Sequence, residues 1–96
     1  MIIGILQVEL FIGGSMSLKD KRKVVKSLKD RIGKGCDVAI AEIDRLDAHQ
    51  RAMLGIATLA NSADRVRQTL HRILESMKKH PEAVVSHHHL EIITGQ

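Results

Sequence analysis

The first twelve residues alternate between apolar and mixed positions, with the period of two that is typical of a β-strand. The even positions are apolar apart from one glycine, namely Ile2, Gly4, Leu6, Val8, Leu10 and Ile12. The odd positions are mixed and include Gln7 and Glu9. We therefore predict a strand over residues 2–12 that has one face on the core and the other partly exposed.

The following segment carries apolar side chains at helical spacing. Five of them fall within one arc of about 120° when each residue turns the helix by 100°: Leu18, Val24, Val25, Leu28 and Ile32. Ser17 is the predicted N-cap, and Asp20 suits the positive end of the helix dipole. Gly33 and Gly35 predict the end of this helix.

Lys21 is the charged residue whose direction falls within that apolar arc. Two placements are open. The side chain can run along apolar surface at the start of the helix and keep its amine in water, which is the placement we favour. Alternatively, it can be buried beside an acidic partner such as Glu42 or Asp47.

Two strands are predicted after the first helix. Residues 36–43 alternate and carry small side chains on one side, which indicates the second strand. A polar connection leads to the third strand at residues 51–61, which is apolar on both faces. A strand with two apolar faces belongs in the centre of a sheet.

The remainder of the chain predicts one more helix and one more strand. Ser62 is the predicted N-cap of the helix, and Pro81 marks its end. Its apolar stripe consists of Val66, Leu70, Ile73, Leu74 and Met77. Residues 83–94 form the last predicted strand. The order β-α-β-β-α-β predicts a single α+β domain over residues 1–96, a ferredoxin-like sandwich of a four-stranded antiparallel sheet with two helices on one face.

Composition narrows the class of protein. The chain has 96 residues, 44% of them hydrophobic and 27% charged, which suits one globular domain. Its single cysteine, Cys36, excludes an internal disulfide and a zinc site of several cysteines. We expect this cysteine to be a buried apolar residue rather than a reactive thiol. The opening segment resembles neither a signal peptide nor a membrane span, so we expect a cytoplasmic protein without membrane contact.

Positive charge is concentrated in residues 18–34. This segment holds eight of the 15 Lys and Arg residues but only two of the 11 acidic residues, so the rest of the chain is net negative. The outward arc of the first predicted helix carries most of it: Lys19, Arg22, Lys23, Lys26 and Lys29. Such an arc can bind a phosphate backbone, which predicts RNA or a ribosomal particle as partner. A solvated surface that keeps a small domain in solution has the same pattern.

Aromatic residues are almost absent, since the chain has one Phe, no Tyr and no Trp. RNA-binding domains of this topology stack bases on aromatic side chains of their two central strands. Here the single ring, Phe11, lies at the far end of the first strand. The sequence therefore argues against a base-stacking sheet surface.

The sheet face away from the helices is a second predicted interaction surface. Its predicted apolar members are Ile3, Ile5, Met53, Ala57, Leu59 and Ile93. An apolar patch with a polar rim is a common interface. This pattern predicts a homodimer, and with it an alternative function as a protein-interaction or scaffold module. The other possibility is an ordinary sheet surface in a monomer.

Catalytic and metal-binding patterns are weak. His87, His89 and Glu91 share one face of the last strand, but no third ligand from another strand is identifiable, so we predict surface or interface histidines and no metal. Gly13 and Gly14 indicate a tight turn rather than an anion site. The densest polar cluster lies between the second and third predicted strands and consists of Glu42, Asp44, Asp47, His49, Gln50 and Arg51. It could be a catalytic site, but we favour a structural network of ion pairs. We predict neither an enzyme nor a cofactor.

Two stretches resemble a known family. They contain Ser17-Leu18-Lys19-x-Lys21-Arg22 and Gln50-Arg51-Ala52-x-Leu54-Gly55, and with the opening segment they are similar to the YlxP-like bacterial family of unknown function. The resemblance extends over about residues 1–94 and implies a ferredoxin-like fold. It implies no activity, although family genes commonly lie near genes of translation and ribosome maturation, which points towards RNA.

Overall fold

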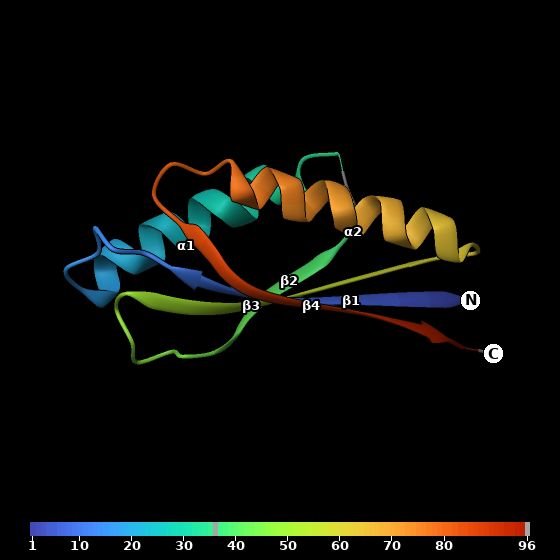
Figure 1. Ribbon diagram of the computed structural model, residues 1–96, viewed down its shortest axis with the longest axis horizontal. Coiled ribbons are helices and arrows are strands. Elements are labelled where there is room, and N and C mark those ends of the chain that lie inside the picture. The colour runs from blue at the N-terminus through green and yellow to red at the C-terminus, as the bar shows by residue number, and fades with distance from the viewer. Residues whose placement is uncertain (36, 96) are drawn as a thin grey trace.

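The computed structural model describes residues 1–35 and 37–95. Along the chain its elements are β1 (Ile2–Phe11), α1 (Leu18–Gly33), β2 (Ala39–Asp44), β3 (Arg51–Ala60), α2 (Ala63–Lys78) and β4 (Val84–Thr94). The four strands form one antiparallel sheet in the order β2-β3-β1-β4. Both helices cover the same face of the sheet (Figure 1). The predicted ferredoxin-like fold is confirmed.

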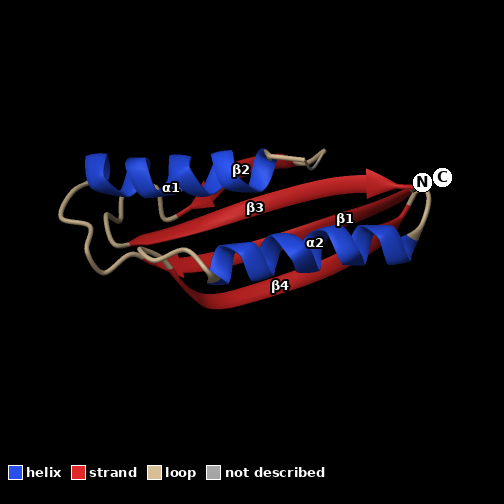
Figure 2. Ribbon diagram, turned by 90° about the horizontal axis from the view of Figure 1, so that it is seen from above, coloured by secondary structure: helices blue, strands red, loops and turns tan. Residues whose placement is uncertain are grey.

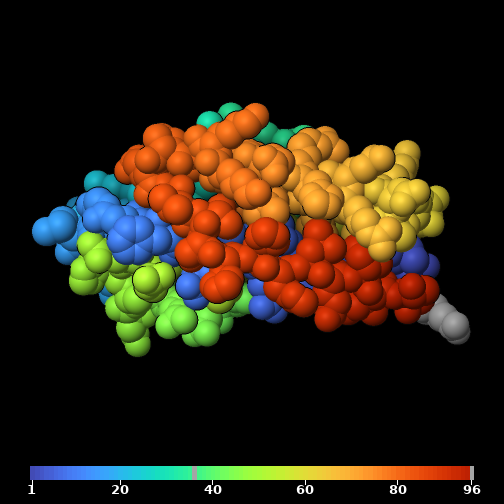
Figure 3. Space-filling view, viewed as in Figure 1, coloured from blue at the N-terminus to red at the C-terminus, as the bar shows by residue number. Residues whose placement is uncertain are grey.

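The two helices divide the covered face between them. Seen from above, α1 lies on the side of β2 and β3, whereas α2 lies over β1 and β4 (Figure 2). Figure 3 shows the side of the molecule on which α2 (yellow to orange) and the edge strand β4 (red) form much of the surface. The even residues of β1 point towards the helices, and Leu6, Val8 and Leu10 are fully buried. The predicted inner face of the first strand is therefore confirmed.

Both predicted helical stripes are buried. On α1 these are Val24, Val25, Leu28 and Ile32, and on α2 they are Val66, Leu70, Ile73, Leu74 and Met77. Leu18 is half-buried at the first turn of α1. Since burial of aliphatic side chains is the main source of stability in a domain of this size, the core lies between these stripes and the sheet.

The second strand is shorter than predicted. It begins at Ala39 instead of residue 36. Cys36, for which we predict a buried apolar side chain, lies outside the described residues. Before the strand, the carbonyl of Asp37 accepts a hydrogen bond from the Thr58 hydroxyl at 3.0 Å. The side chain of Thr58 in β3 thus contacts the segment that leads into β2.

Glycine at position 4 permits a close approach between sheet and helix. A Cβ atom at Gly4 would lie 2.8 Å from Leu70 Cδ1 and closer still to Val66 Cγ1, both on α2. Contacts that short do not occur between carbon atoms in proteins, because interiors are already close-packed. The short distance between α2 and β1 therefore requires that residue 4 has no side chain.

Candidate nucleic-acid interface

The predicted cationic residues all lie on α1. Lys19, Arg22, Lys23 and Lys26 are exposed, while Lys29 is half-buried at the edge of the arc. Among the described residues, no carboxylate oxygen lies within 4.0 Å of a side-chain nitrogen of any of the five. Their charge is therefore not neutralised by ion pairs within the described part of the chain.

Reciprocal hydrogen bonds define the start of α1. The Ser17 hydroxyl accepts from the Asp20 backbone N–H at 3.1 Å, and the Asp20 carboxylate accepts from the Met16 N–H at 3.0 Å. The predicted N-cap is confirmed. The first bond satisfies an N–H group that the first turn of a helix leaves unpaired, and the second ties the preceding loop to that turn. The cationic face therefore starts at a fixed place.

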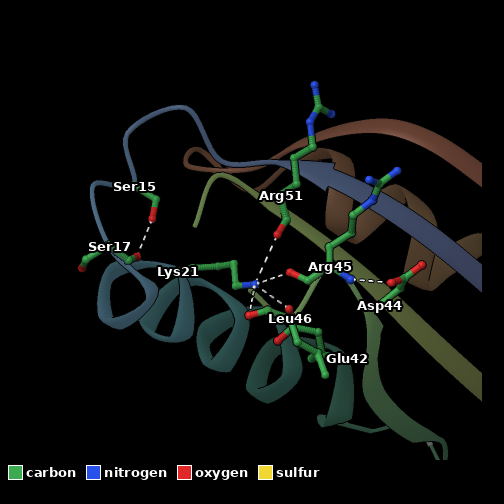
Figure 4. A network of polar contacts seen from close by, with 8 residues as sticks. All are labelled: Ser15, Ser17, Lys21, Glu42, Asp44, Arg45, Leu46 and Arg51. Atoms are coloured by element: carbon green, nitrogen blue, oxygen red, sulfur yellow. Dashed lines mark hydrogen bonds and ion pairs between the residues drawn. The ribbon is translucent and has the colours of Figure 1, made fainter. Parts of the chain in front are cut away.

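Lys21 is buried, with only 1% of its surface exposed. Its ammonium donates to Glu42 Oε2 at 2.7 Å and to the carbonyl of Arg45 at 2.9 Å (Figure 4). Longer hydrogen bonds reach the carbonyls of Leu46 at 3.4 Å and Arg51 at 3.3 Å. The favoured prediction of a solvent-reaching amine is therefore wrong, and the alternative with Glu42 is confirmed. The reason is that β2, the β2–β3 connection and the start of β3 lie against α1 and together supply four acceptors.

The β2–β3 connection contains one residue in a left-handed conformation. Arg45 has φ of 62°, which costs a non-glycine residue about 1–2 kcal/mol. Its N–H is bonded to the Asp44 carboxylate at 2.8 Å, and its carbonyl is one of the acceptors for Lys21. The bonds of Lys21 thus help to hold the connection in a conformation that it would not adopt alone.

Gln50 joins the β2–β3 connection to the loop before α1. Its side-chain amide donates to the carbonyls of Gly13 at 3.2 Å and Ser15 at 3.3 Å. The backbone N–H of Ile12 donates back to the Gln50 carbonyl at 2.8 Å. Lys21 and Gln50 together thus link residues 13–21 to residues 42–51, the regions that carry the two family-like motifs. Four residues of the predicted polar cluster make ion pairs or hydrogen bonds, namely Glu42, Asp44, Gln50 and Arg51. Their partners lie on α1, on β1, in the loop between these two elements and within the β2–β3 connection. Contacts of this kind are those of the structural network that we favour from the sequence.

The open face of the sheet contains the six predicted interface residues. Ile3, Ile5, Met53 and Ala57 are half-buried there, whereas Leu59 is 65% exposed and Ile93 is 39% exposed. The pairing of β1 with both neighbours places Ile3 beside Leu59 and Ile93. The predicted placement of these side chains on one face is confirmed.

Sequence analysis missed the contribution of β2 to this face. Ala39 and Ala41 line a shallow apolar hollow of about 380 Å³ together with Gly55 and Ala57. A bulge in β2 after Glu42 sets Ile43 over Gly55, where an added Cβ would lie 2.9 Å from the Ile43 side chain. The small residues on one side of the predicted second strand could have indicated the hollow. The bulge could not be predicted, because no sequence pattern marks it.

The other end of the open face is polar. Glu9 accepts from Arg45 at 3.2 Å and lies 3.5 Å from Arg51, whose guanidinium stands 5.4 Å from the centroid of the Phe11 ring. His89 and Glu91 are 4.0 Å apart and exposed. Within residues 1–35 and 37–95, no three His, Cys, Asp or Glu side chains converge as a metal site.

No helix in the described part of the chain is long and apolar enough to cross a membrane.

The solved structures that this chain is similar to include two designed proteins. The designed protein LFR1 1, which has a ferredoxin fold, matches with a TM-score of 0.54 at 16% identity, over 99% of this chain and 88% of that one. The designed protein Foldit4 matches with a TM-score of 0.50 at 12% identity, over 98% and 99% of the two chains. At these identities the likeness concerns the fold alone.

Sequence comparison identifies relatives of unknown function. Residues 3–90 match the family described as "Protein of unknown function (DUF503)". The uncharacterized protein YlxP of Bacillus subtilis (strain 168) is 35% identical over 81 residues, which cover 84% of this chain and 88% of that protein. Neither description names an activity. The chain therefore belongs to the YlxP-like family of proteins of unknown function.

Proposed function

We propose that this chain is a single-domain, cytoplasmic, non-enzymatic accessory protein that contacts RNA or a ribosomal particle through the outer face of α1. The observation that supports the proposal most is the unpaired charge on that face. Four cations are exposed there and a fifth is half-buried, and none has an ion-pair partner among the described residues. The opposite side of the same helix is anchored by the buried Lys21.

Such a surface binds by releasing counterions from the phosphate backbone. Five phosphate contacts give a slope of about −4 to −5 in the logarithm of the binding constant against the logarithm of salt concentration on a duplex. The affinity then falls by a factor of about 500 between about 50 and 200 mM salt. Contacts of this kind position a protein without selecting a sequence.

Reversing three charges on α1 is expected to abolish binding to labelled double-stranded RNA in a fluorescence anisotropy titration at low salt. The variant is Lys19→Glu/Lys23→Glu/Lys26→Glu, in which repulsion replaces attraction at three of the five contacts. Its circular dichroism spectrum should match that of the parent, because all three side chains are exposed.

A matched control changes the net charge equally on the other helix. It is Arg67→Glu/Arg72→Glu/Lys78→Glu, whose three residues are exposed on α2. We expect this control to retain most of the affinity, because two of its cations already pair with Asp64 and Glu75. Equal loss in both variants would refute the assignment to α1. Absence of RNA binding by the parent at low salt would refute the function itself.

A second candidate function, a scaffold that works as a homodimer, is favoured by the open face. This face offers both a protrusion and a hollow, since Leu59 projects into solvent while Ala39, Ala41 and Gly55 leave a depression. Two copies related by a two-fold axis would set the protrusion of each copy against the other's hollow, as a symmetric interface requires.

Leu59→Lys is expected to convert a dimer to a monomer, because the change places a charge where two apolar surfaces would meet. Light scattering measures the mass directly. The control Met16→Lys introduces the same charge at a side chain that is 79% exposed in the loop before α1, and it should leave the mass unchanged. A parent protein with the mass of one chain excludes this function.

A further inference from the structure

A cavity of about 670 Å³ opens at the end of the molecule where the loop before α1 meets the start of β4. Its walls come from this loop, from one side of α1 and from the segment between α2 and β4. In Figure 3 the first of these segments (blue) adjoins the last (orange), although they are about 70 residues apart in the sequence. The volume lies within the range of small-molecule sites in proteins.

One wall of this cavity is apolar and carries the chain's only phenylalanine. Phe11 is 38% exposed, and Val24 and Val84 contribute aliphatic surface to the same cavity. The ring lies close to Gly13, where an added Cβ would come within 2.9 Å of it. The guanidinium of Arg51 lies over one face of the ring, so a planar partner would stack on the other face.

The charged lining suits a heterocycle better than a phosphate. Asp20 and Glu82 place two carboxylates around the cavity, against one cation, Lys23. Carboxylates repel phosphate but accept hydrogen bonds from the N–H groups on the edges of nucleobases. The carboxylate of Asp20 already accepts from Met16, and its remaining lone pairs are available.

Lys23 connects this cavity to the cationic face of α1. It lines the cavity and is also one of the five residues proposed to contact phosphate. A strand that runs along α1 would therefore pass the opening with its backbone beside Lys23. Because the cavity is continuous with the cationic face of α1, RNA fits it better than other planar ligands do.

We propose that the cavity receives one unpaired nucleobase of the RNA bound by α1, stacked on Phe11 with its N–H edge towards Asp20 and Glu82. The proposal rests on the proposed function and adds a preference to it. A base can enter only if it is turned out of a helix, and aromatic side chains in RNA-binding proteins take unstacked bases in this way. The protein should therefore bind single-stranded RNA more tightly than its phosphate contacts alone would allow.

The test compares Phe11→Leu with the parent on a labelled RNA of about 12 nucleotides, as a single strand and annealed to its complement. Loss of a base–aromatic stack should weaken single-strand binding at least about five-fold, and leave duplex binding unchanged. The control Leu46→Ala changes an exposed apolar side chain outside the cavity and should bind both RNAs as the parent does.

A second readout does not depend on a variant. Because the chain has one Phe, no Tyr and no Trp, the ring C–H groups of Phe11 form a set of signals apart from those of histidine in a proton–carbon NMR spectrum of carbon-13-labelled protein, in which unlabelled RNA gives no signals. A stacked base should shift these signals on addition of the single strand, and the duplex should not.

The outcomes separate this inference from the function on which it rests. If the single strand binds but neither the Phe11 signals nor the affinity of Phe11→Leu changes, the cavity is not a base site, while the cationic face remains a binding surface. If neither RNA binds at low salt, both proposals fail. If Phe11→Leu weakens both RNAs equally, the ring has a structural role and the base site is refuted.

Discussion

Lys21→Met is expected to lower the free energy of unfolding by about 3–5 kcal/mol, because it leaves the carboxylate of Glu42 without its partner in a largely buried site. The side chains of Lys21 and Glu42 are only 2% and 16% exposed. The substitution also removes the donor for the carbonyls of Arg45, Leu46 and Arg51. Since domains of this size are stable by about 5–15 kcal/mol, the loss is a large part of the total.

Urea denaturation measures this loss, and a fall of at least about 12 °C in the melting temperature should accompany it. Lys26→Met is the matched control, because the same change on the exposed side of α1 should alter stability by less than about 0.5 kcal/mol. The double variant Lys21→Met/Glu42→Leu should recover much of the loss, since apolar pairs can replace buried ion pairs. A single variant as stable as the control would show that the buried pair contributes nothing.

Gly4→Ala is expected to destabilise the protein by about 1–3 kcal/mol through overpacking. The added methyl group would overlap the side chain of Val66 and lie 2.8 Å from Leu70 Cδ1. Val66 is β-branched and part of a helix, so it has essentially one rotamer and cannot turn away. The helix α2 must instead shift from β1, which loosens the core where the first turns of α2 pack against this strand.

A compensating change tests this cause directly. Val66→Ala removes the atoms that obstruct the new methyl group, so the double variant should be more stable than the sum of the two single effects predicts, by about 0.5–3 kcal/mol. Gly14→Ala is the control, because no atom lies within 4 Å of the position that its Cβ would take. Additive effects in the cycle would mean that the cost of Gly4→Ala is not a contact with Val66.

The candidate site was only partly predictable from the sequence. The positions of Lys19, Arg22, Lys23 and Lys26 on an outward arc follow from helical periodicity, and the structure places them there. Glu42 was predicted only as one of two partners in the less favoured placement of Lys21, because the periodicity shows that a residue points inward but not which acceptors meet it. The cavity beside Phe11 was missed as well, since its walls are distant in the sequence and no short motif marks them.

The local sequence signals sufficed for the order of the elements and for the apolar faces of β1, α1 and α2. Alternation along β1, two apolar helical stripes and two serine N-caps predict the β-α-β-β-α-β order, because each signal depends on neighbours a few residues away. Burial of the Lys21 amine, the bulge that sets Ile43 over Gly55 and the meeting of Phe11 with the α2–β4 segment depend on contacts between distant residues. Such contacts exist only after the chain has packed, so the periodicity of the sequence does not show which residues make them.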